Sequence, residues 1–324
     1  MVAQDAHDGA QSRPIAGSSE SFAELTSPYQ RELLVHCYRM LGSIDDAEDA
    51  LQDALVRAWH GRNTFQRAIS FRAWLYRIAT NACLDAIERR KRDRGGGEGH
   101  VIGPIPDDVL EETSAGPEAR YDAHESISLA FATVLQLLPP RQRAVLILRD
   151  VLAWRAAEVA ELLDLTVSSV NSALHRARTT VARQYAQVST AADHLPVGEP
   201  GRLRSLLDRY VQAWEAADVA GLVALLRDDA VVSMPPGVLL RGRQEISAFL
   251  AASVFAGVTR IRLMPIRANR ESGFILYSGS GSNAPLRAYA VLLVDIDGSS
   301  IARMSVFADQ RLINRFRLPE ELSN

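Results

Sequence analysis

The feature of this sequence that most constrains its fold is a change in the spacing of apolar residues near residue 200. Before it, apolar residues such as Leu33, Cys37 and Leu41 recur at the spacing of amphipathic helices. After it, short runs with strand signals alternate with turn residues. Because 324 residues also exceed one ordinary core, we expect several modules, helical ones first and an α+β one last.

The composition fits a globular protein and excludes a membrane span. Hydrophobic residues make up 47% of the chain and charged residues 23%, and no apolar run approaches the roughly 20 residues that cross a bilayer. Residues 1–20 lack the basic and apolar segments of a signal peptide, so a cytoplasmic location is expected. The net charge of −3 argues against a general polyanion binder. Cys37 and Cys83 are expected to be buried thiols, and no metal or cofactor site is predicted.

Turn-forming and acidic stretches divide the chain into segments. The expected organisation is a disordered tail at 1–20, a helical bundle at 21–92, an acidic linker at 93–122, a second helical domain at 123–186, a linker at 187–200 and an α+β domain at 201–318. In the last domain, helices are predicted at 202–216 and 219–227, and strands at 229–234, 261–268, 272–280, 285–296 and 300–309. Asp297-Gly298 predicts a type I′ hairpin turn, because that turn needs positive φ.

From Ala156 the chain reads AAEVAELLDLTVSSVNSALHRAR, which predicts a helix-turn-helix with Thr166 as the second N-cap. The inward stripe of the second helix is Val170, Leu174, Ala177 and Val181. Its opposite face carries hydrogen-bond donors and cations without an acid: Ser168, Ser169, Asn171, Ser172, His175, Arg176 and Arg178. Recognition helices use such faces to read base edges and phosphates, so the pattern predicts DNA binding. A helical hairpin with a solvated polar face is the alternative.

The first helical domain places opposite charges at adjacent sites. A helix at 44–60 begins with a run of acids, whereas 62–94 is rich in Arg and contains Phe71, Trp74 and Tyr76. Acids in a first turn suit the helix dipole, which is a sufficient structural explanation for them. Aromatic residues beside Arg are what single-stranded DNA binding needs, although for Trp74 a core position is an equally good interpretation.

These segments resemble the sigma-70 type of bacterial transcription initiation factor. The stretches YQRELLVHCYRMLGSIDDAEDALQDALVRAWH and SFRAWLYRIATNACLDAIERRKR resemble sigma region 2, and LPPRQRAVLILRDVLAWRAAEVAELLDLTVSSVNSALHRAR resembles region 4. A region 2 joined to a region 4 by a short linker is similar to the extracytoplasmic-function (ECF) group. Within it, the chain is most similar to the sigma G-like subgroup, in which a SnoaL-like domain follows region 4.

The resemblance implies partners and roles for matched positions. It implies binding to core RNA polymerase, through the β′ clamp helices and the β flap, and to promoter DNA. The implied polymerase contacts are Asp45, Asp46, Asp49, Gln52, Asp53, Arg57 and Trp59. The implied contacts to the −10 element are Arg67, Ser70, Phe71, Trp74, Arg77 and Asn81. The second helix of the helix-turn-helix matches the reader of the −35 element.

Three departures from the family stand out. Asp164 occupies a position where the family usually has Gly, and Asn171 and Ala173 stand where Lys and Arg are common. In the linker, VIGPIPDD replaces the Trp-Leu-x-Pro-type motif of the subgroup. The −35 preference and any regulatory role of that motif therefore do not carry over.

The C-terminal domain resembles a SnoaL-like, NTF2-like α+β cone. The resemblance allows a small-molecule ligand in an apolar pocket lined by Trp214, Met234, Phe255, Tyr289 and Phe307, although these residues also suit a core. Asp309 is a candidate general base, with Arg241 or Tyr289 as helper; an Asp paired with Arg at a strand end is the competing interpretation.

Two functions follow for the whole chain. The first is a non-enzymatic initiation factor that directs polymerase to promoters and is modulated by its SnoaL-like domain. The alternative is a bifunctional protein whose third module is a small-molecule isomerase, cyclase or hydrolase. A helix-turn-helix regulator without polymerase contact is disfavoured, because it leaves the region 2 resemblance unexplained.

Overall fold

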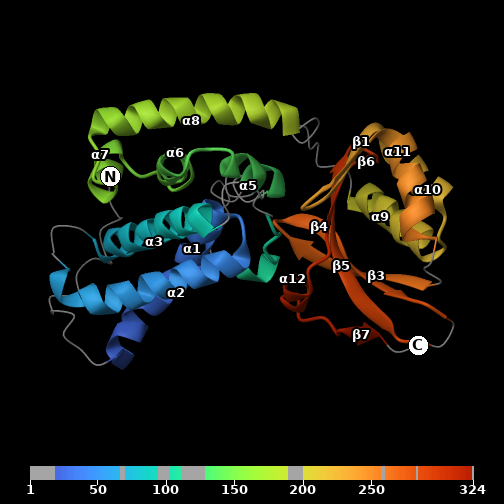
Figure 1. The fold of residues 1–324 in the computed structure, drawn as a ribbon, viewed down its shortest axis with the longest axis horizontal. Coiled ribbons are helices and arrows are strands. Elements are labelled where there is room, and N and C mark those ends of the chain that lie inside the picture. Colours follow the sequence, from blue (N-terminus) through green and yellow to red (C-terminus); the bar gives the residue numbers. More distant parts are fainter. Residues whose placement is uncertain are drawn as a thin grey trace, which may run out of the picture.

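The computed structural model describes residues 19–65, 70–93, 102–110, 128–188, 200–256, 260–281 and 284–322. Figure 1 shows three parts: a bundle of α1 to α3, a layer of α5 to α8 above it, and a sheet with its own helices at the other end. The predicted tail lies almost wholly outside the described residues, as do most of both predicted linkers. None of the described helices combines the length and apolar character needed to cross a membrane.

The first domain is a bundle of α1 (Ser19–Leu41), α2 (Ile44–Gly61) and α3 (Phe71–Asp93), with a 3-10 turn at Arg62–Thr64. α1 ends at Gly42, whose φ of +74° suits glycine, and α2 begins at once because the Ser43 side chain caps it. Cys37 and Cys83 are fully buried, which confirms the prediction of two structural thiols.

The second helical domain contains α5 (Leu129–Gln136), α6 (Pro140–Leu146), a π-helical turn (Ile147–Val151), α7 (Ala156–Leu162) and α8 (Val167–Val188). α7 and α8 form the predicted helix-turn-helix. Thr166 Oγ1 accepts a hydrogen bond from Ser169 N at 3.1 Å, so Thr166 is the expected N-cap. Asp164 adopts a φ of +53° in the turn, which explains why glycine suits this position.

The two helical domains share one core, which the expectation of separate modules did not include. A single buried apolar cluster runs from Leu33 and Cys83 to Val145 and Leu174. Arg143 is only 4% exposed and donates hydrogen bonds to the carbonyl oxygens of Met40 and, at 3.1 Å, of Leu138. The two domains are therefore packed against each other as one body.

The C-terminal domain is the expected α+β cone. Its elements are α9 (Pro200–Glu215), α10 (Val219–Ala224), β1 (Leu226–Met234), β2 (Val238–Arg241), α11 (Gly242–Phe249), a π-helical turn (Leu250–Val254), β3 (Arg260–Ala268), β4 (Glu271–Gly279), β5 (Leu286–Asp297), β6 (Ser300–Phe307), α12 (Gln310–Asn314) and β7 (Glu321–Leu322). The sheet order is β2-β1-β6-β5-β4-β3, with β7 on β5. Only β1 and β6 pair in parallel among these described strands. All five predicted strands are present, whereas β2 and β7 were not predicted.

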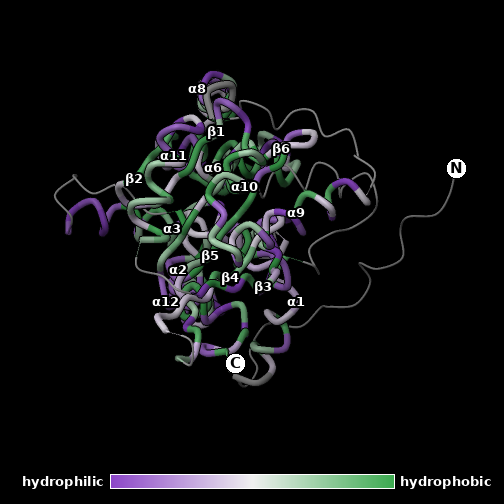
Figure 2. Tube along the Cα trace, turned by 90° about the vertical axis from the view of Figure 1, so that its right-hand side faces the viewer, coloured by the Kyte–Doolittle hydropathy of each residue, from purple (hydrophilic) through white to green (hydrophobic). Residues whose placement is uncertain are grey.

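The two faces of the sheet have different neighbours. α9, α10 and α11 cover the face turned away from the helical domains, around Tyr210, Trp214 and Phe274 (Figure 1). Figure 2 looks at this end, where β4 and β5 are mostly hydrophobic between helices with hydrophilic stretches. The opposite face carries a second apolar cluster, which includes Ile275, Phe307 and Leu129 of α5. The C-terminal domain thus packs onto the rest of the chain through its outer sheet face, the one that α9, α10 and α11 leave uncovered.

Two hairpin turns connect neighbouring strands of the sheet, and they are of different types. Between β5 and β6 the loop residues are Gly298 and Ser299, and only Gly298 has positive φ (+61°), which fits type II′ rather than the predicted I′. Between β3 and β4, Asn269 and Arg270 both have positive φ, at +53° and +61°, as a type I′ turn requires.

The β3–β4 turn inserts into the segment that was expected to be an acidic linker. Asn269 Nδ2 donates to Tyr38 Oη of α1, and Ile105 N donates to Asn269 Oδ1, each at 2.9 Å. Asp107 accepts from Arg270 N at 2.6 Å. Ile105 is fully buried, so within 102–110 this segment is a buried wedge between two domains and not a solvated spacer. The apolar residues on either side of the acids, among them Ile105 and Leu110, make this burial possible.

Candidate polymerase and promoter interfaces

The expected polymerase surface lies on α2, opposite a buried stripe of Ala47, Ala50, Ala54 and Ala58. Of the predicted contacts, Asp49 and Gln52 are exposed. Asp53 is only partly exposed and accepts a hydrogen bond from Arg57 at 2.8 Å. Arg57 also reaches Asp85 of α3 at 2.6 Å, and the Trp59 ring packs against Phe22 and under Arg62. Asp53, Arg57 and Trp59 therefore help to hold the bundle together.

The start of α2 is covered by a residue from the far end of the chain. Arg315, just after α12, donates to Asp45 at 3.0 Å and to Glu48 at 2.7 Å. Its side chain is 24% exposed, and its hydrogen bonds to Glu48 and Asp45 raise the pKa of Arg315. Asp46 pairs with Arg90 of α3. Nothing in the local sequence around Arg315 signalled this contact, because it joins positions about 270 residues apart.

The expected −10 surface is partly buried in this arrangement. Phe71 stacks on Trp74 with ring centroids 5.6 Å apart, and Trp74 is 8% exposed. Of the two roles open for Trp74, the structure shows the core position. Ser70 and Asn81 are exposed, whereas Arg67 lies outside the described residues.

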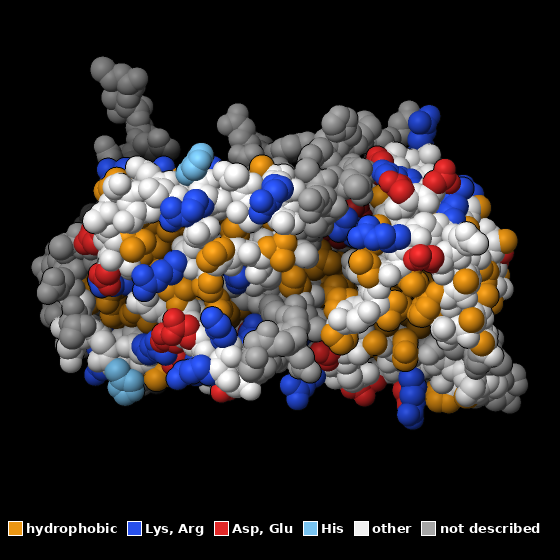
Figure 3. Space-filling view, turned by 45° about the horizontal axis from the view of Figure 1, so that its top comes forward, with side chains coloured by type: hydrophobic (Ala, Val, Ile, Leu, Met, Phe, Trp, Pro, Cys, Tyr) orange, Lys and Arg blue, Asp and Glu red, His pale blue; other side chains and the backbone are white. Residues whose placement is uncertain are grey.

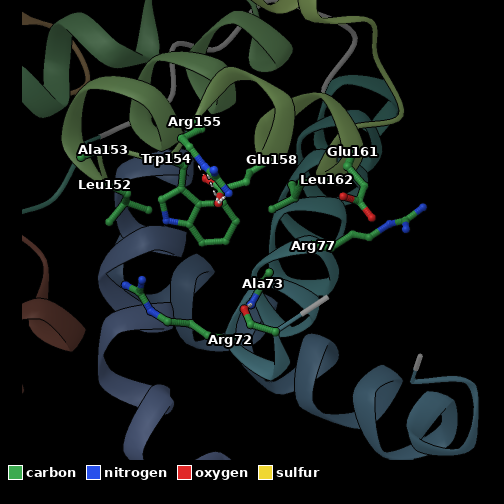
Figure 4. Close-up of a pocket in the computed structure, with 11 residues that line it drawn as sticks. Arg72, Ala73, Arg77, Leu152, Ala153, Trp154, Arg155, Glu158, Glu161 and Leu162 are labelled. Carbon is green, nitrogen blue, oxygen red and sulfur yellow. Dashed lines mark hydrogen bonds and ion pairs between the residues drawn. The ribbon is translucent and has the colours of Figure 1, made fainter. Parts of the chain in front are cut away.

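A cavity of about 440 Å³ separates α3 from the helix-turn-helix. Figure 4 shows Trp154 pointing toward α3, beside the ion pair of Arg155 and Glu158 and above Arg72. The Trp154 ring lies 5.2 Å from that of Tyr76. At one side Arg77, an expected −10 contact, bonds to Asp164 in the helix-turn-helix at 3.0 Å. The expected −10 surface thus faces the helix-turn-helix directly.

The expected −35 surface is fully presented. All seven predicted residues on α8 are exposed. Val170, Leu174 and Ala177 are buried as the stripe predicts, whereas its fourth member, Val181, is half-buried. Figure 3 looks onto this side, where Lys and Arg side chains gather over the helical domains. Arg178 is bonded to Asp150 at 2.7 Å, so part of its charge is already balanced. Arg176 makes no ion pair within the described residues, which leaves its charge available.

The five residues expected to line a cone pocket are not brought together. Trp214 and Phe255 are in contact, with ring centroids 5.3 Å apart, and Met234 is half-buried. Phe307 points from the opposite sheet face, and Tyr289 is 61% exposed. Tyr289 is the extra residue between paired Ala288 and Ala290, at a β-bulge.

The candidate base Asp309 is not in a cone pocket either. It is exposed and caps α12, accepting from Arg311 N at 2.8 Å. The competing interpretation, an Asp paired with an Arg side chain, is also wrong, because the donor is a backbone N–H. A capping role explains this carboxylate without any chemistry.

Comparisons with known proteins agree with these three domains. Residues 25–93 match the family described as Sigma-70 region 2, residues 128–181 match Sigma-70, region 4, and residues 207–304 match the SnoaL-like domain.

Individual proteins are similar over longer stretches. The ECF RNA polymerase sigma factor SigG of Mycobacterium tuberculosis is 37% identical over 93% of this chain and 85% of its own length. SigW of Bacillus subtilis, another ECF sigma factor, is 31% identical over 52% of this chain and 90% of its own. The crystal structure of the Mycobacterium tuberculosis ECF sigma factor SigJ has the same fold, with a TM-score of 0.61 and 20% identity over 91% of this chain and all of that one. On the similarity to SigG across almost the whole chain, this protein belongs to the ECF RNA polymerase sigma factors.

Proposed function

We propose that this sigma factor rests in a closed arrangement, and that its C-terminal domain helps to hold it closed. In the open form, α2 docks on the β′ clamp helices of core polymerase and region 4 on the β flap. α3 then contacts the −10 element and the exposed face of α8 reads the −35 element. Initiation of transcription at promoters is the function of the family, and in this chain the closed state controls that initiation.

The ion pair of Arg77 with Asp164 carries this proposal. Elements centred near −10 and −35 are roughly 25 base pairs apart, which is about 85 Å of straight B-DNA at about 3.4 Å per base pair. In the structure an expected −10 contact lies 3.0 Å from the turn that leads into the −35 helix. One molecule cannot span both elements in this arrangement, so regions 2 and 4 have to separate before a promoter is bound.

Contacts from the C-terminal domain support the closed arrangement from two sides. Arg315 pairs with Asp45 and Glu48 on the expected polymerase surface. The Asn269 turn bonds to region 2 and to the wedge at 102–110, while Glu271 accepts from Leu129 N of region 4 at 2.9 Å. A domain tethered this close acts at millimolar effective concentration, so individually weak contacts suffice.

We propose that the C-terminal domain acts through these contacts and not through catalysis. Its candidate base caps a helix, and its expected pocket residues lie on both faces of the sheet. The bifunctional alternative needs a titratable group facing a cavity on the helix-covered side, and the residues proposed for it do not meet that requirement.

Reversing the charge of Arg315 tests the contact on α2. Arg315→Glu places a third acid beside Asp45 and Glu48, so the expected result is a roughly fivefold higher affinity for core polymerase, which corresponds to about 1 kcal/mol. Fluorescence anisotropy of the labelled sigma factor with purified core polymerase measures it. Arg311→Glu is the matched control, since Arg311 is exposed on α12, one turn before Arg315. An increase for both variants, or for neither, would contradict the proposed contact.

The −35 assignment predicts two different kinds of loss. Asn171→Ala should cost about 1–3 kcal/mol of binding free energy on the cognate promoter and relax preference at one base pair. Arg176→Ala should weaken binding to all sequences alike and lower the salt slope by about one. Quantitative binding of the holoenzyme to a set of single-base promoter variants at several salt concentrations separates the two. If both variants lose affinity equally on every sequence, α8 does not read bases.

A further inference from the structure

A second cavity, of about 490 Å³, lies between the C-terminal domain and region 4. One wall is the outer face of β1, β5 and β6, and the other is the start of α5, which packs against the sheet near β4 (Figure 1). Leu129, Leu293 and Phe307 supply an apolar wall, and Leu239, which is 54% exposed, stands at the mouth. The cavity lies on the sheet face opposite to α9, α10 and α11, so it is separate from the interior of the cone.

Only some of the polar groups that line this cavity have a partner within the described residues. Asp295 and Arg303 face each other across β5 and β6, yet neither side chain makes a hydrogen bond or ion pair within the described residues. Glu271 accepts one hydrogen bond, from Leu129 N at 2.9 Å. Ser233 and Ser305 bond to each other at 3.3 Å. Two further charged residues line the cavity, Asp229 and Arg241, but both are exposed and Asp229 is paired with Arg227. The less exposed charged groups of the lining are therefore the carboxylates of Glu271 and Asp295 and the guanidinium of Arg303.

The electrostatics of this wall favour an added positive charge. Burial, with a smaller contribution from the neighbouring Asp295 charge, raises the pKa of Glu271 to about 7. Burial also raises the pKa of Asp295, and Arg303 offsets this only in part. Each carboxylate thus lacks a full counter-charge in a partly desolvated site, where a cation is attracted more strongly than in water.

We propose that this cavity binds a small organic cation with an apolar body. Its protonated amine lies between Glu271 and Asp295, and its apolar part lies against Leu293 and Phe307. A ligand in this position touches both the C-terminal domain and α5, so it binds the closed arrangement more tightly than the open one. On the closed state proposed above, it therefore represses initiation.

Three probes of equal length test the ligand class: 4-phenylbutylamine, 4-phenylbutan-1-ol and 4-phenylbutanoate. Calorimetry with the full chain should give an affinity for the amine at least about tenfold above that for the alcohol or the carboxylate. Asp295→Asn and Glu271→Gln should each lower the amine affinity by about fivefold or more. Leu239→Trp, at an exposed position, should lower it by closing the mouth. Asp208→Asn, on α9 beyond the other sheet face, removes the same charge and should leave the affinity unchanged.

Equal affinities for the three probes, or tighter binding of the carboxylate, would overturn the assignment. So would amine binding that Asp295→Asn and Leu239→Trp both leave unchanged. A second measurement separates the site from the control mechanism. The amine should lower run-off transcription by the full chain several-fold and leave a chain ending at Val188 unaffected. Amine binding without that effect would keep the site and overturn its coupling to the closed state.

Discussion

Joining positions 77 and 164 covalently should reduce promoter-directed transcription on the order of 100-fold. This is the loss expected when only about 1% of the molecules can open. The expected reagent is a short bismaleimide reacting with Arg77→Cys and Asp164→Cys in the same chain. The two native thiols are fully buried, so they do not compete for it. Because the link keeps the −10 surface against the helix-turn-helix, the factor cannot reach both promoter elements. Run-off transcription with core polymerase before and after cross-linking measures the loss.

The comparison is made within one double variant, so any direct effect of replacing Arg77 on DNA binding cancels. Treating each single variant with a monofunctional maleimide controls for modification of the thiols. If the cross-linked protein keeps more than about half of its activity, regions 2 and 4 do not need to separate and the closed state is not inhibitory.

Removing the C-terminal domain should have the opposite effect and raise transcription about tenfold. A chain that ends at Val188 retains α8 but loses the contacts of Arg315, Asn269 and Glu271 with the helical domains. Losing them shifts the equilibrium toward the open form, while the packing between regions 2 and 4 themselves remains. The measurement is run-off transcription from one promoter at equal concentrations of the two proteins.

Arg315→Glu within the full chain should reproduce part of this increase, and the same change cannot act in the truncated chain. Equal or lower transcription by the truncated chain would mean that the C-terminal domain assembles the productive form. In that case its contacts would be preorganising regions 2 and 4 for polymerase.

Local patterns predicted most of the secondary structure. The stripe of Val170, Leu174 and Ala177 and the cap at Thr166 are enough to define α8, since both depend only on residues within a few turns of one another. The five predicted strands are present for the same reason. β2 and β7 were missed because they are short, at four and two residues, and carry too few positions to show an alternation.

Contacts between distant segments could not be predicted. In the sequence, Asn269 is an ordinary turn residue. Its side-chain amide nevertheless forms hydrogen bonds with both Tyr38 and Ile105, each more than 160 positions away in the chain. The segment at 102–110 is acidic and rich in proline, which favours a linker, but Ile105 and Leu110 are apolar enough to bury it. The assumed pocket failed because its residues come from both faces of the sheet: Phe307 lies in the cluster on the uncovered face and Trp214 in the cluster under the helices.

The core that regions 2 and 4 share bears on whether free molecules of the factor associate with one another. When the regions separate, apolar side chains on both become exposed to solvent. Tyr76 and Trp154, for example, are only 0% and 9% exposed in the closed form. An open molecule without polymerase would present two apolar faces and associate with other copies. On the closed state proposed above, the contacts of the C-terminal domain would therefore also limit self-association of the free factor. Polymerase, if it covers the same faces in the open form, would replace that protection when a molecule opens.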